Sequence, residues 1–287
     1  MGWPELTKKE WRTMTVARLR EIATEVSFSL DAASSSGEKA LNYAVRECNE
    51  TAVIKTLLEM GGDVNAGGLW RWTPLMSAAA CTENVEIIKL LLESGARIDD
   101  RSPDGRTALM AACRDNPLVD VVRSLLISGA DVNSRDEGGK TPLIFAAGST
   151  KNPVIVRVLL QAGATLDARD RYGESALMHA ARWNEVGEVS QILLDAGLKP
   201  NEKWPDGRTM LMLAAQSNKN PEVLIQLVRA GADPNAKDKY GNTAFDWARR
   251  ENENHWVALS LKAMQIDAMM KSAGGANKRG GEWSQKA

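Results

Sequence analysis

A strict internal repeat of 34 residues constrains this chain more than any other feature. A hydroxyl side chain, a glycine and a short amide or carboxylate each return at this step. The hydroxyl positions are Thr73, Thr107, Thr141, Ser175, Thr209 and Thr243. The glycines are Gly61, Gly95, Gly129, Gly163, Gly197 and Gly231, and the third set is Asn65, Asp99, Asn133, Asp167, Asn201 and Asn235. A period of this length is typical of a solenoid built by stacking one small unit, and such stacks commonly offer extended binding surfaces.

Each unit is predicted to contain two short helices joined by turns. Thr141 is a helix N-cap, and Pro142 occupies the first helical position, where its missing N–H has no cost. Asn152 and Pro153 repeat the same arrangement before the second helix. Gly163 then ends that helix, because glycine readily adopts a positive φ. The residues that follow are rich in Asp, Asn, Gly and Arg, which favours a turn leading to the next unit.

These motifs resemble the ankyrin repeat, with its T-P-L-x-x-A-A first helix, L-L-x-x-G-A-D-V-N-A helix end and hairpin finger. The first-helix openings are Thr73-Pro74-Leu75, Thr107-Ala108-Leu109, Thr141-Pro142-Leu143, Ser175-Ala176-Leu177 and Thr209-Met210-Leu211. The resemblance covers roughly residues 15–272 and implies an all-α repeat solenoid of stacked helix-turn-helix units with projecting hairpin fingers. Tetratricopeptide repeats also have a 34-residue period, but the G-A-D-x-N turn and the D-x-x-G finger have no place in that pattern.

Two departures from the family pattern stand out. The period is 34 rather than 33, with the extra residue between the two helices, where it should lengthen the turn. The histidine that usually follows T-P-L and ties successive loops together is also absent. In its place stand Met76, Met110, Ile144, Met178 and Met212. We therefore expect packing to substitute for that histidine.

The end units are irregular, as terminal capping units must be. Thr7 and Glu10 form a predicted capping box ahead of a helix that contains Trp11. The C-terminal stretch is rich in glycine and polar residues, and Trp283 is predicted to be an exposed residue of a flexible tail. The predicted organisation is an N-terminal half-repeat cap at 1–33, six repeats at 34–237, a capping repeat at 238–272 and a tail at 273–287.

Composition and motifs argue against several classes of function. The net charge of −1 gives no global attraction to nucleic acid or acidic membranes. No run approaches ~18 apolar residues, and no secretory signal is visible. Cys48, Cys81 and Cys113 lack metal-ligand spacing, which favours reduced thiols in a cytoplasmic protein. The two histidines fall at unrelated positions, and no phosphate, dinucleotide or metalloprotease motif is present, so we predict no enzyme, cofactor or metal.

The resemblance implies a concave binding face lined by finger tips and first-helix ends. Aromatic and arginine side chains dominate the energetics of protein interfaces, so their presence here predicts a binding site. The aromatic candidates are Trp70, Trp72, Tyr172, Trp183, Trp204 and Tyr240. The basic candidates are Arg101, Arg106, Arg114, Arg135, Lys140, Arg169, Arg182, Lys203, Arg208 and Lys237.

The candidates differ in how well a structural role would account for them. A basic residue before the finger aspartate commonly pairs with neighbouring acids, so structural use is favoured for the ladder of Arg101, Arg135, Arg169, Lys203 and Lys237. For Trp70 and Trp72 a partner contact is favoured over packing between fingers. Arg71 occupies the position of the finger glycine, which predicts a distorted finger.

The sequence therefore predicts a monomeric, non-catalytic scaffold that binds a protein or peptide on its concave face. Binding of nucleic acid or another polyanion, through the Arg/Lys ladder and Trp/Tyr stacking, is the alternative. A third possibility is an accessory to an enzyme or toxin whose activity resides in the partner. The residues do not distinguish that role from the first.

Overall fold

The computed structural model describes residues 6–25, 39–204 and 206–279. These residues form sixteen α-helices and one 3-10 helix, and the described ranges contain no strand. They are divided between two compact units, Met1–Glu174 and Ser175–Ala287. None of the described helices is both long and apolar enough to cross a membrane.

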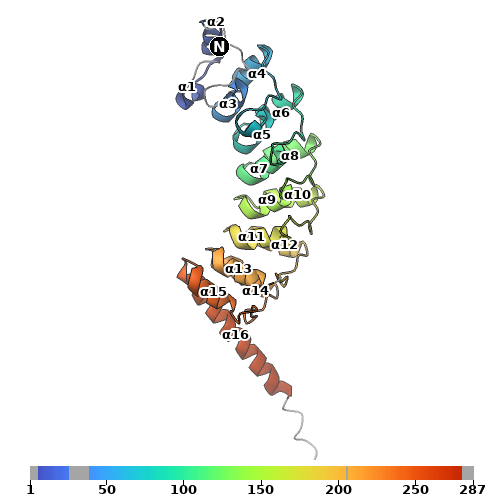
Figure 1. Ribbon diagram of the computed structural model, residues 1–287, viewed down its shortest axis with the longest axis vertical. Helices are drawn as coiled ribbons and strands as arrows, with labels where there is room; N and C mark the ends of the chain where they lie inside the picture. The colour runs from blue at the N-terminus through green and yellow to red at the C-terminus, as the bar shows by residue number, and fades with distance from the viewer. Residues whose placement is uncertain (1–5, 26–38, 205, 280–287) are drawn as a thin grey trace, which may run out of the picture. The chain divides into compact units, whose positions relative to one another are not determined.

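The first unit contains four complete helix pairs behind a shorter N-terminal pair. First helices α3, α5, α7 and α9 pack in succession, and second helices α4, α6, α8 and α10 form the adjoining row (Figure 1). The helices are α1 (Lys8–Arg12), α2 (Val16–Glu25), α3 (Ala40–Glu47), α4 (Thr51–Glu59), η1 (Leu69–Arg71), α5 (Pro74–Cys81), α6 (Val85–Glu93), α7 (Ala108–Asp115), α8 (Val119–Ile127), α9 (Pro142–Ser149) and α10 (Val154–Gln161).

The N-terminal pair packs on the first repeat, with α1 against α3 and α2 against α4. The predicted capping box is confirmed: Thr7 Oγ accepts the Glu10 N–H at 3.3 Å, and Thr7 N–H donates to Glu10 Oε2 at 2.7 Å. Trp11 is buried. Lys8 and Arg12 also lie 3.6 and 3.8 Å from the carboxylate of Glu47 in α3. The pair therefore caps the stack, while the residue boundaries proposed for the cap and repeats remain predictions.

The second unit repeats the arrangement with three further pairs. In it α13 packs between α11 and α15, and α14 packs between α12 and α16 (Figure 1). The helices are α11 (Ala176–Trp183), α12 (Gly187–Asp195), α13 (Met210–Ser217), α14 (Pro221–Arg229), α15 (Ala244–Glu251) and α16 (His255–Arg279).

Helix α16 is longer than the sequence suggested. It continues through Gly274 and Gly275 to Arg279, whereas we expected the flexible tail to begin at residue 273. Each glycine costs a helix about 1 kcal/mol but keeps its N–H, so it weakens the helix without breaking its hydrogen bonds. The rest of the predicted tail, with Trp283, lies outside the described residues.

The repeated hydroxyls and glycines have the predicted roles. Thr73 Oγ accepts the Met76 N–H at 3.3 Å, and the other five repeated hydroxyls cap their helices in the same way. In α13 the Met212 sulfur accepts the Thr209 N–H at 3.4 Å, which closes a capping box through sulfur. At the other end of each unit, glycines such as Gly163, at φ 87°, follow the second helices.

Side-chain amides, in addition to packing, tie successive repeats together. Asn116 is buried, and its Nδ2 donates to the backbone oxygens of Ala79 at 3.1 Å and Thr82 at 3.0 Å. In the second unit Asn218 and Asn252 donate in the same way to the repeats before them. These amides supply inter-repeat bonds in a chain that lacks the family's usual histidine.

Candidate binding surface

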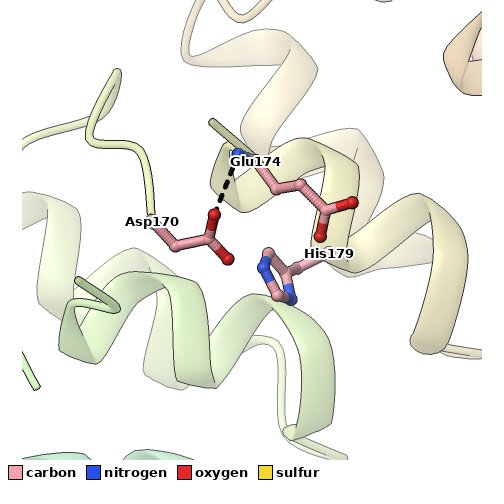
Figure 2. A group of neighbouring side chains, drawn as sticks. All are labelled: Asp170, Glu174 and His179. Atoms are coloured by element: carbon pink, nitrogen blue, oxygen red, sulfur yellow. Dashed lines mark hydrogen bonds between the residues drawn. The ribbon is translucent and has the colours of Figure 1, made fainter. Parts of the chain in front are cut away.

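The fingers are the hairpins formed by the six residues before each helical cap. In the first unit they are finger 1 (67–72), finger 2 (101–106), finger 3 (135–140) and finger 4 (169–174); in the second, finger 5 (203–208) and finger 6 (237–242). In finger 4 the Asp170 carboxylate accepts the N–H groups of Tyr172 at 2.9 Å and Glu174 at 3.0 Å; Figure 2 shows the second of these bonds. The Asp170 carboxylate thus stabilises the hairpin through hydrogen bonds to its backbone.

Arginine side chains join neighbouring fingers of the first unit. Arg101 Nη1 donates to the carbonyl oxygens of Gly105 at 3.2 Å and Arg135 at 2.6 Å. Arg135 Nη1 repeats the pattern one finger later, and Arg169 Nη1 donates to the Gly173 oxygen at 2.8 Å. All three residues remain exposed, but this nitrogen of each is bonded to finger backbone. The ladder is therefore part of the framework.

Backbone hydrogen bonds form a second link between fingers. Glu137 N–H donates to the Asp104 oxygen at 3.0 Å, and Arg171 N–H donates to the Gly138 oxygen at 2.8 Å. Neighbouring fingers approach each other so closely that the turn requires a glycine. A Cβ added to Gly105, for example, would lie 2.8 Å from the Glu137 nitrogen.

Finger 1 departs from this pattern at every one of these positions. Gly67 replaces the ladder arginine, and Pro103 in finger 2 has no N–H to donate back to finger 1. Arg71 stands at the turn glycine's position. Both Trp70 and Arg71 have a positive φ, at 59° and 55°. A side chain in this conformation costs roughly 1–2 kcal/mol per residue, so finger 1 is strained. Neither of the two links described above joins finger 1 to finger 2 among the described residues.

The base of finger 1 is nevertheless fixed. The amide Nδ2 of Asn42, fully buried on α3, donates to the Trp72 carbonyl oxygen at 2.6 Å. The hairpin is closed by bonds from Arg71 N–H to the Gly68 oxygen at 2.9 Å and from Trp72 N–H to the Leu69 oxygen at 3.2 Å. Finger 1 therefore has a defined shape, although it lacks the links that join the other fingers.

A cleft of about 660 Å³ lies between fingers 1 and 2. It is lined by Gly68, Leu69, Trp70, Arg71, Trp72, Pro103, Asp104 and Arg106. Trp70 is 78% exposed and stands at its rim. Arg106 Nε lies 2.9 Å from the Asp104 carboxylate, an ion-pair distance without hydrogen-bond geometry. The structure thus brings together Trp70, Trp72 and Arg106 of the predicted site residues.

Comparison with known protein families agrees with this architecture. A family model for ankyrin repeats matches three times, at residues 41–136, 114–203 and 187–271. This chain belongs to the ankyrin repeat family. No curated protein is similar enough to count as a match. Ankyrin repeats are in general protein–protein interaction modules and non-enzymatic scaffolds, although that generality identifies neither a partner nor a binding face.

The remaining predicted site residues of the first ankyrin unit lie in separate local contacts. Arg114 Nε is 3.5 Å from the Asp115 carboxylate. Arg106 and Lys140 both lie over the Phe145 ring, at 5.4 and 5.9 Å from its centre. Tyr172 is 68% exposed at the tip of finger 4, with the Arg171 guanidinium 4.8 Å from its ring.

The second ankyrin unit carries the other predicted residues. Trp183 is 55% exposed and Tyr240 is 73% exposed, and each has a basic neighbour over its ring. For Trp183 that neighbour is Arg182, at 4.6 Å. Arg208 is bonded to Asp206 at 2.6 Å. Trp204 is half-buried, and Lys203 and Lys237 are exposed.

Sequence reasoning missed the role of three residues at this surface. Phe145 and Trp247 each lie beneath an arginine guanidinium, from Arg106 and Arg208 respectively. Pro103 lines the cleft and lacks the N–H that would bond finger 2 to finger 1. The equivalent residues Glu137, Arg171 and Lys239 each donate an N–H to the preceding finger, a pairing that the sequence pattern does not reveal.

Proposed function

We propose that this ankyrin repeat protein is a non-catalytic scaffold that binds another protein or peptide on its finger tips and first-helix ends. The observation that carries the proposal is the exposure of large aromatic side chains at these positions. They are Trp70 and Tyr172 in the first unit and Trp183 and Tyr240 in the second. Partly apolar rings that are exposed without a packing role are typical of interface anchors.

The framework of the fingers supports the proposal. Arginine and aspartate side chains hold fingers 2, 3 and 4 in shape before any partner arrives, so little ordering entropy is lost on binding. The proposal includes the monomeric state and the cytoplasmic location expected from the sequence.

The test is affinity capture from native cells with the wild-type chain, Trp70→Ala and Ile127→Ala, followed by mass spectrometry. Ile127 is the matched control, because it is 86% exposed but ends a second helix instead of lying on a finger. We expect Trp70→Ala to weaken binding of the captured partner by about 2 kcal/mol, roughly thirtyfold, while Ile127→Ala leaves it unchanged.

Stability measurements separate a lost contact from a lost fold. Trp70→Ala should change the free energy of unfolding by less than ~0.5 kcal/mol, because its ring is mostly in solvent. Trp72 is half-buried, so its replacement should also lower stability. Unchanged capture by Trp70→Ala, Tyr172→Ala, Trp183→Ala and Tyr240→Ala would contradict the proposed binding surface.

A further inference from the structure

We infer that the cleft between fingers 1 and 2 binds a peptide segment in which a large apolar side chain lies next to an aspartate or glutamate. This inference rests on the proposed function and deepens it, because it assigns one site and one ligand chemistry.

The cleft is open because the links that close the equivalent gap elsewhere in the first unit are absent. Between fingers 2 and 3 the gap is closed by the Arg101 guanidinium and by the Glu137 N–H. Between fingers 1 and 2 the equivalent positions are Gly67, which has no side chain to donate, and Pro103, which has no N–H. The Cβ of Arg71 is compatible with a finger 2 that stands away from it, because the same atom at Gly105 would collide with the next finger.

The walls of the cleft are mainly apolar. Leu69 and Trp70, from the tip of finger 1, are 41% and 78% exposed, and Trp72 and Pro103 complete the lining on the two sides. The volume of about 660 Å³ falls within the range of roughly 300–1,000 Å³ that is usual for sites enclosing small ligands. A large aliphatic or aromatic side chain could bury itself against these rings and would remove apolar surface on both partners from water.

The net charge of the cleft determines which residue of the peptide is preferred beside its apolar side chain. Two arginines against one aspartate leave the lining with one positive charge. Arg106 is paired with Asp104, whereas Arg71 has no anion within ion-pair distance among the described residues. A ligand carboxylate would therefore pair with the Arg71 guanidinium, and a basic ligand residue would be repelled. One unpaired cation in an apolar cleft suits a single carboxylate better than a run of phosphates.

The retained strain agrees with a binding role. Residues held at unfavourable φ cluster at ligand-binding sites, where they fix a shape that a relaxed turn would not present. Here the left-handed conformation of Trp70 and Arg71 sets both side chains at the same cleft.

The experiment selects ligands and then closes the cleft. A phage library of random dodecapeptides is panned on the full-length protein, and the enriched peptides are synthesised with a fluorescent label for anisotropy titrations. We expect enrichment of a large apolar residue adjacent to Asp or Glu. Affinity for these peptides should fall at least tenfold in Trp70→Ala. It should fall similarly in the double variant Gly67→Arg/Pro103→Glu, which restores the missing ladder arginine and N–H donor.

Two controls fix the interpretation. Ile127→Ala removes an exposed apolar side chain at the end of a second helix, outside the cleft and the fingers, and should change peptide affinity less than twofold. Thermal melting followed by circular dichroism should show Trp70→Ala as stable as the wild type and the double variant folded but less stable, because the Cβ added at Gly67 would lie 3.3 Å from the Arg71 Cα. If the double variant fails to fold, Trp70→Ala and Arg71→Glu carry the test, and Arg71→Glu should reverse the preference for acidic peptides.

Each contrary result has a distinct meaning. Peptides that bind equally well to Trp70→Ala would overturn the cleft assignment but leave the proposed scaffold function standing. Enrichment of apolar residues beside Lys or Arg would overturn the ligand chemistry. If an oligouridylate displaced the peptides and lost its own binding in Trp70→Ala, the cleft would belong to nucleic acid. A selection that yielded no binding peptide would count against both the inference and the proposed function.

Discussion

Five of the six fingers place a glycine at the turn, with φ from 76° at Gly139 to 81° at Gly241, and finger 1 places Arg71 there at 55°. The backbone bond that closes the turn is kept, since Arg71 N–H donates to the Gly68 oxygen as Gly105 N–H donates to the Ser102 oxygen. The arginine must therefore adopt a conformation that suits glycine. This strain fits the binding role proposed above for Arg71, because strained residues cluster at ligand-binding sites.

Substitution at this position should stabilise the protein. We expect Arg71→Gly to raise the free energy of unfolding by about 1 kcal/mol, because it removes the left-handed strain of a residue with a Cβ. The reverse change, Gly105→Arg, should lower it by more, since the Cβ would also meet the Glu137 nitrogen at 2.8 Å. Urea denaturation of both variants measures the two changes in the free energy of unfolding. A stability loss in Arg71→Gly would show that the arginine makes contacts that outweigh its strain.

The thiol of Cys81 should be unreactive although the residue is exposed. Its Sγ donates to the Ser77 carbonyl oxygen at 2.9 Å, and burial of the sulfur raises the pKa of the thiol from 9.0 to about 11. At pH 8 this lowers the thiolate fraction about a hundredfold, so alkylation by iodoacetamide should slow by about that factor relative to the urea-unfolded chain. Peptide mass spectrometry reads the rate at Cys81. Equal rates in the folded and unfolded protein would contradict the pKa shift.

The same shift gives a pH dependence of stability. Between pH 9 and about 11 the unfolded chain releases the Cys81 proton while the folded chain keeps it. The folded state thus binds more protons in this window, and its stability should fall as the pH rises. Burial also raises the pKa of Cys48 and Cys113, which adds to the same trend.

At the scale of the helix, stability depends on bonds between one repeat and the next. Asn116 ends α7 and donates to two carbonyl oxygens of the preceding repeat, at Ala79 and Thr82. Asn116→Ala leaves both oxygens without this donor in a buried setting, so we expect a loss of about 2–4 kcal/mol. Hydrogen exchange should show the largest loss of protection in α5 and α7.

Threonine provides the matched control for Asn116. It occupies the equivalent positions 82 and 150, where the Thr150 hydroxyl donates locally to the Asn152 oxygen at 3.2 Å. Asn116→Thr should therefore destabilise less than Asn116→Ala. If the two variants were equally stable, the inter-repeat bonds of Asn116 would contribute nothing measurable.

The elements also show which features could be predicted from the sequence. Caps such as Thr107 and helix-ending glycines such as Gly163 act within a few residues of themselves, so their chemistry was visible in the repeat. The opening of finger 1 depends on Pro103, whose missing N–H matters only through a partner in the preceding finger, 33 residues earlier at Trp70. That pairing emerges only when the fingers are in place. The same holds for Asn116, which recurs at the 34-residue step but bonds across repeats.

For the molecule as a whole, the distribution of charge bears on the choice between a protein partner and a polyanion. The net charge is −1, and in the first unit the ladder arginines donate to finger carbonyls. Arg106 and Arg208 are held by aspartates in their own fingers. These finger arginines are therefore already bonded within the framework, whereas Lys203 and Lys237 are exposed in the second unit. This arrangement favours partners recognised by apolar contacts.

Salt dependence tests that conclusion directly. Raising NaCl from about 50 to 200 mM should weaken binding of the captured partner less than tenfold, because apolar contacts are only weakly screened. A ligand held through six to ten phosphates would lose roughly 10³–10⁵ in affinity over the same range. Anisotropy titrations at several salt concentrations give the slope of log affinity against log salt concentration. The double variant Lys203→Ala/Lys237→Ala should leave this slope unchanged. A steep slope that this double variant reduced would instead identify the second unit as a polyanion site and favour the nucleic-acid alternative.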